Sequence, residues 1–363
     1  MKFCLIGNTL SNLVLAKLLL NKKIRVDLLY KEVKKKQKDT RTIGISKDNI
    51  DFLNKNLFNL KKICWDINEI KIFNEIDINK ELLNFESLNT KPFSILKYNK
   101  LYEKINYTLN KEKNFNRYKI KEKFNYKSIS KNKYDIIINS DLNNEISINY
   151  FFKRIKKNYN STAYTILLNH NKCANKIARQ IFTKIGPLAF LPISNISTSV
   201  VFSIFDRKYS YDENQIKNYI IKYNNNYKIK SFTKFEKFKL KFSFPRNYFY
   251  KNILLFGDGL HQIHPLAGQG FNMTLRNIRI LGKIIDEQLE LGLPLDYRIL
   301  KKFELKAKHL DFIFASGIDF IHEFFKLDND FENIFSKKIF KLLGKNRMFN
   351  KYTSLFANKG INF

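Results

Sequence analysis

The first 30 residues alternate between short apolar runs and a segment with helical periodicity. Lys2–Ile6 and residues 24–30 are apolar runs of strand length. Between them, Leu10–Asn21 carries apolar residues at three- and four-residue spacings, the pattern of a helix with a buried face. A strand, a helix and a second strand in this order predict a βαβ unit, in which the two strands pair in parallel.

The turn between the first strand and the helix reads Gly7-Asn8-Thr9-Leu10-Ser11-Asn12. It stands where dinucleotide-binding proteins carry Gly-x-Gly-x-x-Gly, and of the three glycines only Gly7 is present. In that fingerprint the second glycine lets the backbone approach a pyrophosphate, and the third allows close packing of helix on strand. We therefore expect Thr9 and Asn12 to loosen both contacts.

The acidic residue that would bind ribose hydroxyls about 20 residues farther on is displaced as well. The predicted second strand ends at Tyr30, and the nearest acid is Glu32. Farther along, Arg41 precedes Ile45-Ser46 and a helical pattern over residues 50–57. One interpretation of Arg41 is a surface salt bridge; the other, a residue beside a bound cofactor, is implied by the family resemblance given below.

The middle of the chain begins with weak signals and ends with strong ones. Within the Lys- and Asn-rich part, Tyr98–Leu109 is predicted to be a helix, and residues 134–138 a strand that precedes Asp141. Residues 163–205 carry alternating and continuous β-branched runs separated by Gly-Pro turns. This pattern predicts consecutive antiparallel strands.

The strongest chemical signal is a strand, a glycine-rich loop and a helix late in the chain. The apolar run 253–256 leads into Gly257-Asp258-Gly259, and an amphipathic helix begins near Gln269. Glycines let a backbone approach a ligand, Asp258 can accept hydrogen bonds, and the helix start offers free N–H groups. This layout predicts a nucleotide-cofactor site. The loop and the first helical turn add Pro265, Gly268, Gln269, Gly270, Phe271 and Asn272 as candidates.

Two histidines in this loop, His261 and His264, form a His-x-x-His pair. Zinc needs three or four ligands, and neither a nearby cysteine nor a helical carboxylate completes a set. We therefore predict no metal site and expect both histidines to be turn residues hydrogen-bonded to the backbone, with His264 near the cofactor. Residues 297–325 and 331–343, after this segment, are predicted to be packing helices.

Composition and charge limit the kinds of partner that we expect this protein to bind. The formal net charge of +33 over 363 residues would suit nucleic acid or an anionic membrane. However, lysines are scattered while Gly (12), Pro (6) and Trp (1) are scarce, which indicates AT-rich codon bias. We weigh this codon bias against the alternative of a nucleic-acid binder, which would retain DNA in a tight, salt-sensitive way.

The three cysteines lie far apart, and no apolar run approaches the ~20 residues that cross a bilayer. We therefore expect a cytoplasmic protein, or one attached peripherally to the inner membrane.

The segment 257–272 and the string Gly186-Pro187-Leu188-Ala189-Phe190-Leu191-Pro192 resemble the FAD-dependent aromatic hydroxylases of ubiquinone biosynthesis, the 2-polyprenyl-6-methoxyphenol hydroxylase-like branch. The resemblance implies an α/β fold in which a Rossmann-like FAD-binding domain is interleaved with a mixed or antiparallel-sheet substrate domain, followed by C-terminal helices. It implies these boundaries: FAD-binding domain 1–82, 130–150 and 250–297; substrate domain 83–129 and 151–249; C-terminal helices 298–363.

The same resemblance implies that FAD, reduced by NAD(P)H or another donor, reacts with O₂ and hydroxylates the ring of a polyprenylated phenol. No side chain is expected to be an acid–base catalyst, because the cofactor carries the difficult chemistry. The main alternative is a degenerate, non-catalytic member that serves as a scaffold in a ubiquinone-biosynthesis assembly. The implied cofactor contacts are Gly7, Thr9, Leu10, Glu32, Arg41, Asp258, Pro265, Gly268, Gln269, Gly270, Phe271 and Asn272.

Overall fold

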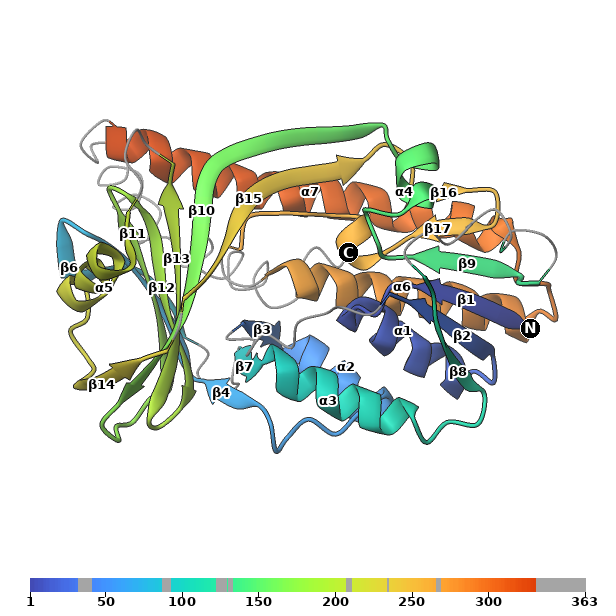
Figure 1. Ribbon diagram of the computed structural model, residues 1–363, viewed down its shortest axis with the longest axis horizontal. Helices are drawn as coiled ribbons and strands as arrows, with labels where there is room; N and C mark the ends of the chain where they lie inside the picture. The colour runs from blue at the N-terminus through green and yellow to red at the C-terminus, as the bar shows by residue number, and fades with distance from the viewer. Residues whose placement is uncertain are drawn as a thin grey trace.

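The computed structural model describes residues 1–31, 41–86, 93–121, 129, 133–206, 211–233, 235–265 and 269–330. For residues 85, 86 and 325–330 within these ranges, only the backbone is described. The chain forms two lobes, one around a parallel sheet and one around a large antiparallel sheet (Figure 1). Two long strands and the last helix extend from one lobe to the other (Figure 1).

The first lobe is built on a six-stranded sheet with the order β16-β17-β9-β1-β2-β8. Its strands are β1 (Lys2–Ile6), β2 (Arg25–Tyr30), β8 (Phe115–Lys119), β9 (Ile136–Asn139), β16 (Phe249–Tyr250) and β17 (Ile253–Leu255). All neighbours pair in parallel except β16 with β17. Strands β9 and β17 are buried along their whole length, as continuous apolar runs in a sheet covered on both faces should be. The predicted βαβ unit is confirmed.

Several helices belong to this lobe, and α1 (Leu10–Asn21) packs directly against β1 and β2. The others are α2 (Lys47–Asn56), α3 (Tyr98–Leu109), α4 (Glu145–Tyr150) and α6 (Gln269–Glu290). Helix α1 is buried around most of its circumference rather than on one face, because α3 and α6 cover the sides that the sheet leaves open. A Cβ atom at Gly282 of α6 would lie 2.9 Å from Leu18 Cδ2 of α1, so this glycine permits close contact of the two helices.

The second lobe is built on the largest sheet, with the order β14-β10-β13-β12-β11-β5-β6, and β15 also pairs with β10. The strands are β5 (Glu69–Asn74), β6 (Asp77–Glu86), β10 (Arg154–His170), β11 (Ile177–Thr183), β12 (Gly186–Ser194), β13 (Ser197–Phe205), β14 (Ile229–Phe232) and β15 (Glu236–Pro245). Helix α5 (Glu213–Lys222) contributes Ile216 and Ile220 to the core on one face of this sheet. The consecutive antiparallel strands predicted for residues 163–205 are confirmed.

A small sheet and a long helix join the lobes. The small sheet has the order β3-β7-β4 and comprises β3 (Thr42–Ser46), β4 (Trp65–Ile67) and β7 (Phe93–Lys97). Side chains of this sheet pack with Ala178 of the large sheet in a separate apolar cluster. Helix α7 (Tyr297–Asp330) is longer than the predicted helix 297–325 and runs behind both lobes (Figure 1). The predicted helix 331–343 lies outside the described residues.

Strand pairing divides the chain differently from the predicted boundaries at two places. Strands β5 and β6 belong to the large sheet, although the predicted FAD-binding segment runs through residue 82. Strand β8 pairs with β2 in the parallel sheet, although residues 83–129 were assigned to the substrate domain. These segments have weak periodicity and carry charged residues, so the sequence does not indicate which strands they pair with. The pairing is seen only in the assembled sheets. The boundaries of the units that fold together remain a prediction.

Candidate cofactor site

The late glycine-rich segment and the first turn of the chain lie against each other. Strands β1, β9 and β17 are parallel neighbours, so their carboxyl ends meet at one edge of the sheet. After β17, Gly257–Gly259 forms a short 3-10 turn, and Gly257 has a φ of +57°. A Cβ atom at Gly257 would lie 2.4 Å from both Cβ and Oγ of Ser11. The absence of a side chain at this position therefore allows the two segments to touch.

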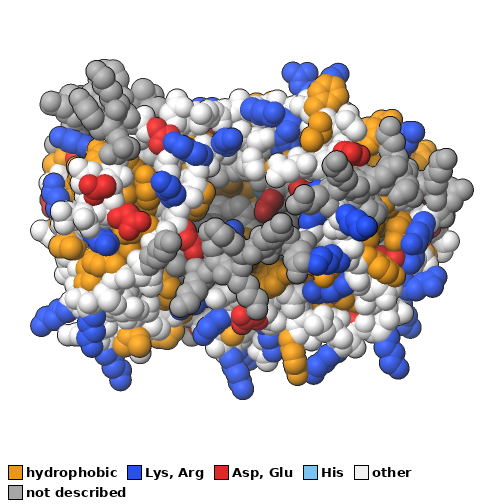
Figure 2. Space-filling view, in the orientation of Figure 1, with side chains coloured by type: hydrophobic (Ala, Val, Ile, Leu, Met, Phe, Trp, Pro, Cys, Tyr) orange, Lys and Arg blue, Asp and Glu red, His pale blue; other side chains and the backbone are white. Residues whose placement is uncertain are grey.

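The Asp258 carboxylate lies at this edge and remains accessible to solvent. Surrounding protein atoms nevertheless desolvate it and raise its pKa, while electrostatic interactions with His261 and Arg41 act in the opposite direction. An accessible group that is enclosed by protein lines a hollow rather than a convex surface. The space-filling view is hollowed between the two lobes (Figure 2). No hydrogen bond from described residues to the Asp258 side chain occurs, so its oxygens are available to a ligand.

Arg41 lies near the same edge. Its guanidinium carbon is 4.2 Å from the centre of the Tyr98 ring, a cation–π contact with the first residue of α3. It also lowers the pKa of Asp258, which places its charge near this carboxylate. The assignment of Arg41 as a residue beside a bound cofactor remains a prediction.

In the first turn, side chains form hydrogen bonds at positions where the fingerprint would have glycines. Gly7 has a φ of +102°, and a Cβ atom there would lie 2.7 Å from Ser140 Oγ. Thr9 is the N-cap of α1; its hydroxyl accepts a hydrogen bond from Asn12 N at 3.3 Å and lies 2.9 Å from Ser140 Oγ. The buried Asn12 amide donates to Ile6 O at 2.9 Å and to Gly7 O at 2.8 Å. The side chains that replace two glycines thus fix the turn by their own hydrogen bonds.

Leu10 follows this turn as the first residue of α1, and its side chain is buried. It can therefore reach a ligand only through its backbone N–H group, one of the unpaired donors at a helix start. The N-terminus of α1 also carries the positive end of the helix dipole, which favours a phosphate. The chemistry of this end of the helix fits the diphosphate of a dinucleotide even without the second glycine.

The first turn of α6 is held against β3 and α2 by Asn272. Its side-chain oxygen accepts hydrogen bonds from Ser46 N at 3.0 Å and Asn49 Nδ2 at 2.9 Å, and its amide donates to Gly44 O at 2.9 Å. These contacts use the polar atoms that a cofactor would need. We therefore attribute to Asn272 the orientation of α6 rather than direct cofactor binding by its side chain.

The other candidate cofactor-binding residues in this segment differ in how accessible they are. Gln269 is buried, and Phe271 packs against the main core. At Gly270 a Cβ atom would meet nothing closer than Ile263 Cγ1 at 3.9 Å, so open space adjoins this position. Pro265 is partly buried and directly follows His264. Gly268 and Glu32 lie outside the described residues, so their assignments remain predictions.

The structure overturns one expectation about the loop histidines. Neither ring nitrogen of His264 has a hydrogen-bond partner among the described residues, although the side chain is 1% exposed. Burial, together with the nearby His322, holds the pKa of His264 well below its ordinary value. His264 is thus a neutral ring held by packing, because the turn brings no backbone carbonyl close to it. No group of three or more His, Cys, Asp or Glu side chains suited to a metal occurs among the described residues.

Sequence reasoning missed three residues that shape this region: Ser140, Tyr159 and His322. Ser140 directly follows β9 and contacts Thr9 across more than 100 positions of sequence. Tyr159 of β10 and His322 of α7 pack around His264. None of these residues belongs to a local motif, so the signal that could have identified them is their spatial neighbourhood alone.

This arrangement, a parallel sheet with the ligand edge at β1 and β17 and a large antiparallel sheet facing it, is the fold of FAD-dependent aromatic monooxygenases. The structure resembles p-nitrophenol 4-monooxygenase from Pseudomonas putida DLL-E4, with a TM-score of 0.77 and 11% identity over 99% of this chain and 98% of that one. It also resembles PqsL from Pseudomonas aeruginosa, with a TM-score of 0.70 and 13% identity over 91% and 97%. The predicted fold class is confirmed.

Sequence similarity points to a narrower group. The chain is 30% identical over 89 residues to the mitochondrial ubiquinone biosynthesis monooxygenase COQ6 of Dictyostelium discoideum, covering 24% of this chain and 18% of that protein. It is 33% identical over 76 residues to the 3-demethoxyubiquinol 3-hydroxylase of Escherichia coli K12, covering 21% and 19%. The aligned part thus spans about a fifth of the length of these relatives. No family model matches the chain. The predicted resemblance to ubiquinone-biosynthesis hydroxylases is confirmed over these segments.

Proposed function

We propose that this protein is an FAD-dependent monooxygenase that hydroxylates the aromatic ring of a polyprenylated phenol during ubiquinone biosynthesis. The observation that carries the proposal is the junction of Gly257 with Ser11, which places the accessible Asp258 carboxylate beside the start of α1. A dinucleotide cofactor needs both places at once, a phosphate-binding helix start and an acceptor for its hydroxyl groups.

The described residues divide the binding of FAD between them. The start of α1, including the Leu10 N–H, would hold the diphosphate, and Asp258 would accept hydrogen bonds from ribityl hydroxyls. The N-terminus of α6 would face the ring and favour negative charge on it. Arg41 would add a positive charge near the cofactor. When bound, FAD supplies the activation of O₂ and the transfer of one oxygen atom to the substrate ring.

The protein's own task is then to hold the phenol next to the cofactor and to exclude water. The large sheet turns one face toward the first lobe (Figure 1), and a phenol with its apolar tail would lie in the hollow between the lobes (Figure 2). NAD(P)H remains our proposal for the electron donor. The absorbance spectrum of the purified protein tests the proposal first, and analysis of quinone intermediates in cells lacking the protein tests the substrate.

A second candidate is a degenerate scaffold in a ubiquinone-biosynthesis assembly. The hydrogen bonds of Thr9 and Asn12 favour it, because they occupy a turn that other dinucleotide-binding proteins leave to glycine. A protein that is colourless and cannot be reconstituted with FAD would support the scaffold. A yellow protein whose flavin is reduced by NADPH and reoxidised by O₂ would reject it.

Peripheral association with an anionic membrane is a further part of the proposal. No helix among the described residues is long and apolar enough to span a bilayer. Helix α7 exposes four large apolar side chains within one face, and the net charge of +33 would attract acidic headgroups. These side chains are Leu305, Phe312, Ile313 and Phe320, which are 68%, 44%, 51% and 69% exposed. Flotation with acidic and neutral vesicles tests this; recovery with neither would reject it.

A further inference from the structure

Three buried rings meet where the two lobes join the loop of residues 260–265, which we call the cofactor loop. Tyr159 of β10, His264 of the loop before α6 and His322 of α7 are 2%, 1% and 2% exposed, and we call them the ring cluster. The centroids of His264 and His322 are 4.3 Å apart. Tyr159 lies 5.3 Å from His264 and 4.8 Å from His322, in edge-on contacts. Each ring thus touches both others.

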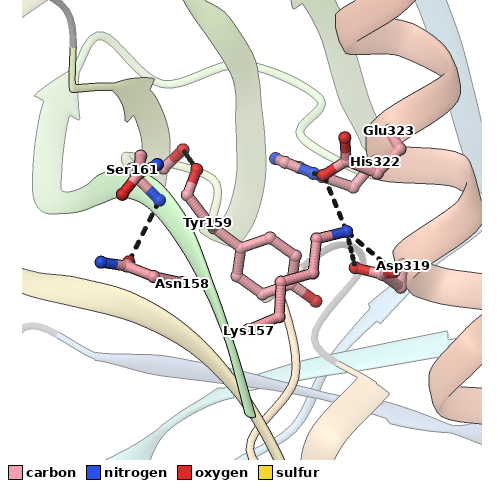
Figure 3. A network of polar contacts seen from close by, with 8 residues as sticks. Lys157, Asn158, Tyr159, Ser161, Asp319, His322 and Glu323 are labelled. Carbon is pink, nitrogen blue, oxygen red and sulfur yellow. Dashed lines mark hydrogen bonds and ion pairs between the residues drawn. The ribbon is translucent and has the colours of Figure 1, made fainter.

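Two of the three rings lie near charged side chains outside the cluster. Lys157 Nζ of β10 binds Asp319 at 3.0 Å and Glu323 at 3.0 Å on α7, and His322 Nδ1 lies 3.3 Å from Glu323 Oε1 (Figure 3). The same lysine nitrogen lies 5.7 Å from the centre of the Tyr159 ring. Partly exposed ion pairs contribute little to stability individually. Together, however, these contacts fix which side of α7 faces β10.

No hydrogen bond from a described residue orients the His264 ring, and the Tyr159 hydroxyl has none either. A buried polar group without a partner costs free energy, so its placement must follow from the packing around it. Tyr159 and His322 supply that packing. His264 directly precedes Pro265, the last described residue before α6 begins at Gln269.

From this geometry we infer that Tyr159 and His322 are positioning residues for the cofactor loop, which they hold in place by fixing His264. The inference rests on the proposed function, because it takes the loop that ends at Pro265 to border the bound FAD. In this role α7, which lies outside the cofactor site, controls the affinity for FAD through a contact at its far end.

A merely structural role of the cluster makes a different prediction. If His322 only filled core volume, its removal would lower the free energy of unfolding and leave FAD affinity unchanged. If His322 acts through His264, the two substitutions cannot have independent effects on FAD binding. A double-mutant cycle on the dissociation constant for FAD therefore separates the two roles.

The experiment compares His264→Ala, His322→Ala and the double variant with the full chain, by FAD titration and by the visible circular dichroism of the bound flavin. We expect each single variant to weaken FAD binding about tenfold, equivalent to about 1.4 kcal/mol, and the double variant to bind no more weakly than either. His322→Phe, which keeps a ring, should restore most of the affinity and the flavin signal. His309→Ala on the same helix, where the ring is exposed, is the matched control and should change neither.

Unchanged FAD affinity in His322→Ala, or additive effects in the double variant, would overturn the inference. If His322→Ala does not fold, His322→Leu carries the same expectation, because it removes the ring while filling most of its volume. Failure of the wild-type protein to bind FAD would reject the proposed function and the inference together. Normal FAD binding by the wild type and by every variant would reject the inference alone.

Discussion

The two halves of the candidate site are built in opposite ways. In the first turn, Thr9 and Asn12 stand at glycine positions of the fingerprint, and the Thr9 hydroxyl and the Asn12 amide NH₂ form hydrogen bonds with the turn and with Ser140. In the late segment the glycines remain, and the exposed Asp258 carboxylate lacks a hydrogen-bond partner among the described residues. The side-chain donors of the first turn are therefore used without a ligand, whereas the late segment presents a carboxylate that a ligand would satisfy.

This difference indicates that the capacity to bind FAD depends more on the late segment than on the first turn. A turn that satisfies its own donors loses affinity for a phosphate but gains local stability. A segment with unsatisfied groups does the reverse. Substitutions in the two places should consequently separate stability from cofactor affinity.

The largest expected effect is on stability, at the contact between the two halves. Gly257→Val would place its Cβ atom 2.4 Å from Ser11 in a backbone with a φ of +57°. Overpacking and left-handed strain together should lower the free energy of unfolding by at least about 3 kcal/mol, measured by urea denaturation of the apo protein. Gly270→Ala, where the nearest atom is 3.9 Å away, is the control and should not destabilise the protein. Equal stability of both variants would contradict the contact.

The next effect is on cofactor affinity alone. Asp258→Ala should raise the dissociation constant for FAD about 10- to 100-fold, because a charge-assisted hydrogen bond is lost. The free energy of unfolding should hardly change, because no described residue hydrogen-bonds to this carboxylate. Asp258→Asn, which keeps an acceptor without the charge, should lie between the two. Unchanged flavin content in Asp258→Ala would reject the assignment of Asp258 to the cofactor.

The late segment should also make stability depend on pH. Burial lowers the pKa of both His261 and His264, so in acid the unfolded chain takes up protons that the folded chain does not. Stability should therefore fall as the pH drops below about 6.5, by on the order of 1 kcal/mol per histidine for each pH unit. Urea denaturation between pH 8 and pH 5.5 measures the slope. A His264→Gln variant should have a shallower slope, and an identical slope would contradict the assignment.

The smallest effect tests the first turn. Thr9→Gly restores a fingerprint glycine but removes the N-cap hydroxyl and its contact with Ser140, so it should cost about 1 kcal/mol of stability. Affinity for FAD should stay equal or increase, because the backbone can come closer to the diphosphate. Thr9→Ser keeps the hydroxyl and should match the wild type in both measurements. A loss of FAD affinity in Thr9→Gly would show that the threonine itself contributes to binding.

The sequence alone determined the local elements and their chemistry. Continuous apolar runs and three- to four-residue spacings identified β1, α1 and α3, because burial on both faces or on one face leaves a direct trace in residue order. It likewise predicted the glycine-rich segment before α6 and the carboxylate at its start. These features depend on neighbouring residues, which interact whatever the rest of the chain does.

Only the tertiary structure decided which distant segments meet. It placed β5 and β6 in the large sheet and β8 in the parallel one, paired Thr9 with Ser140, and brought His322 against His264. Such contacts join residues separated by tens to hundreds of positions, and nothing in their local patterns distinguishes one partner from another. Their stability comes from the joint burial of many side chains, so a partner is fixed only when the whole core assembles.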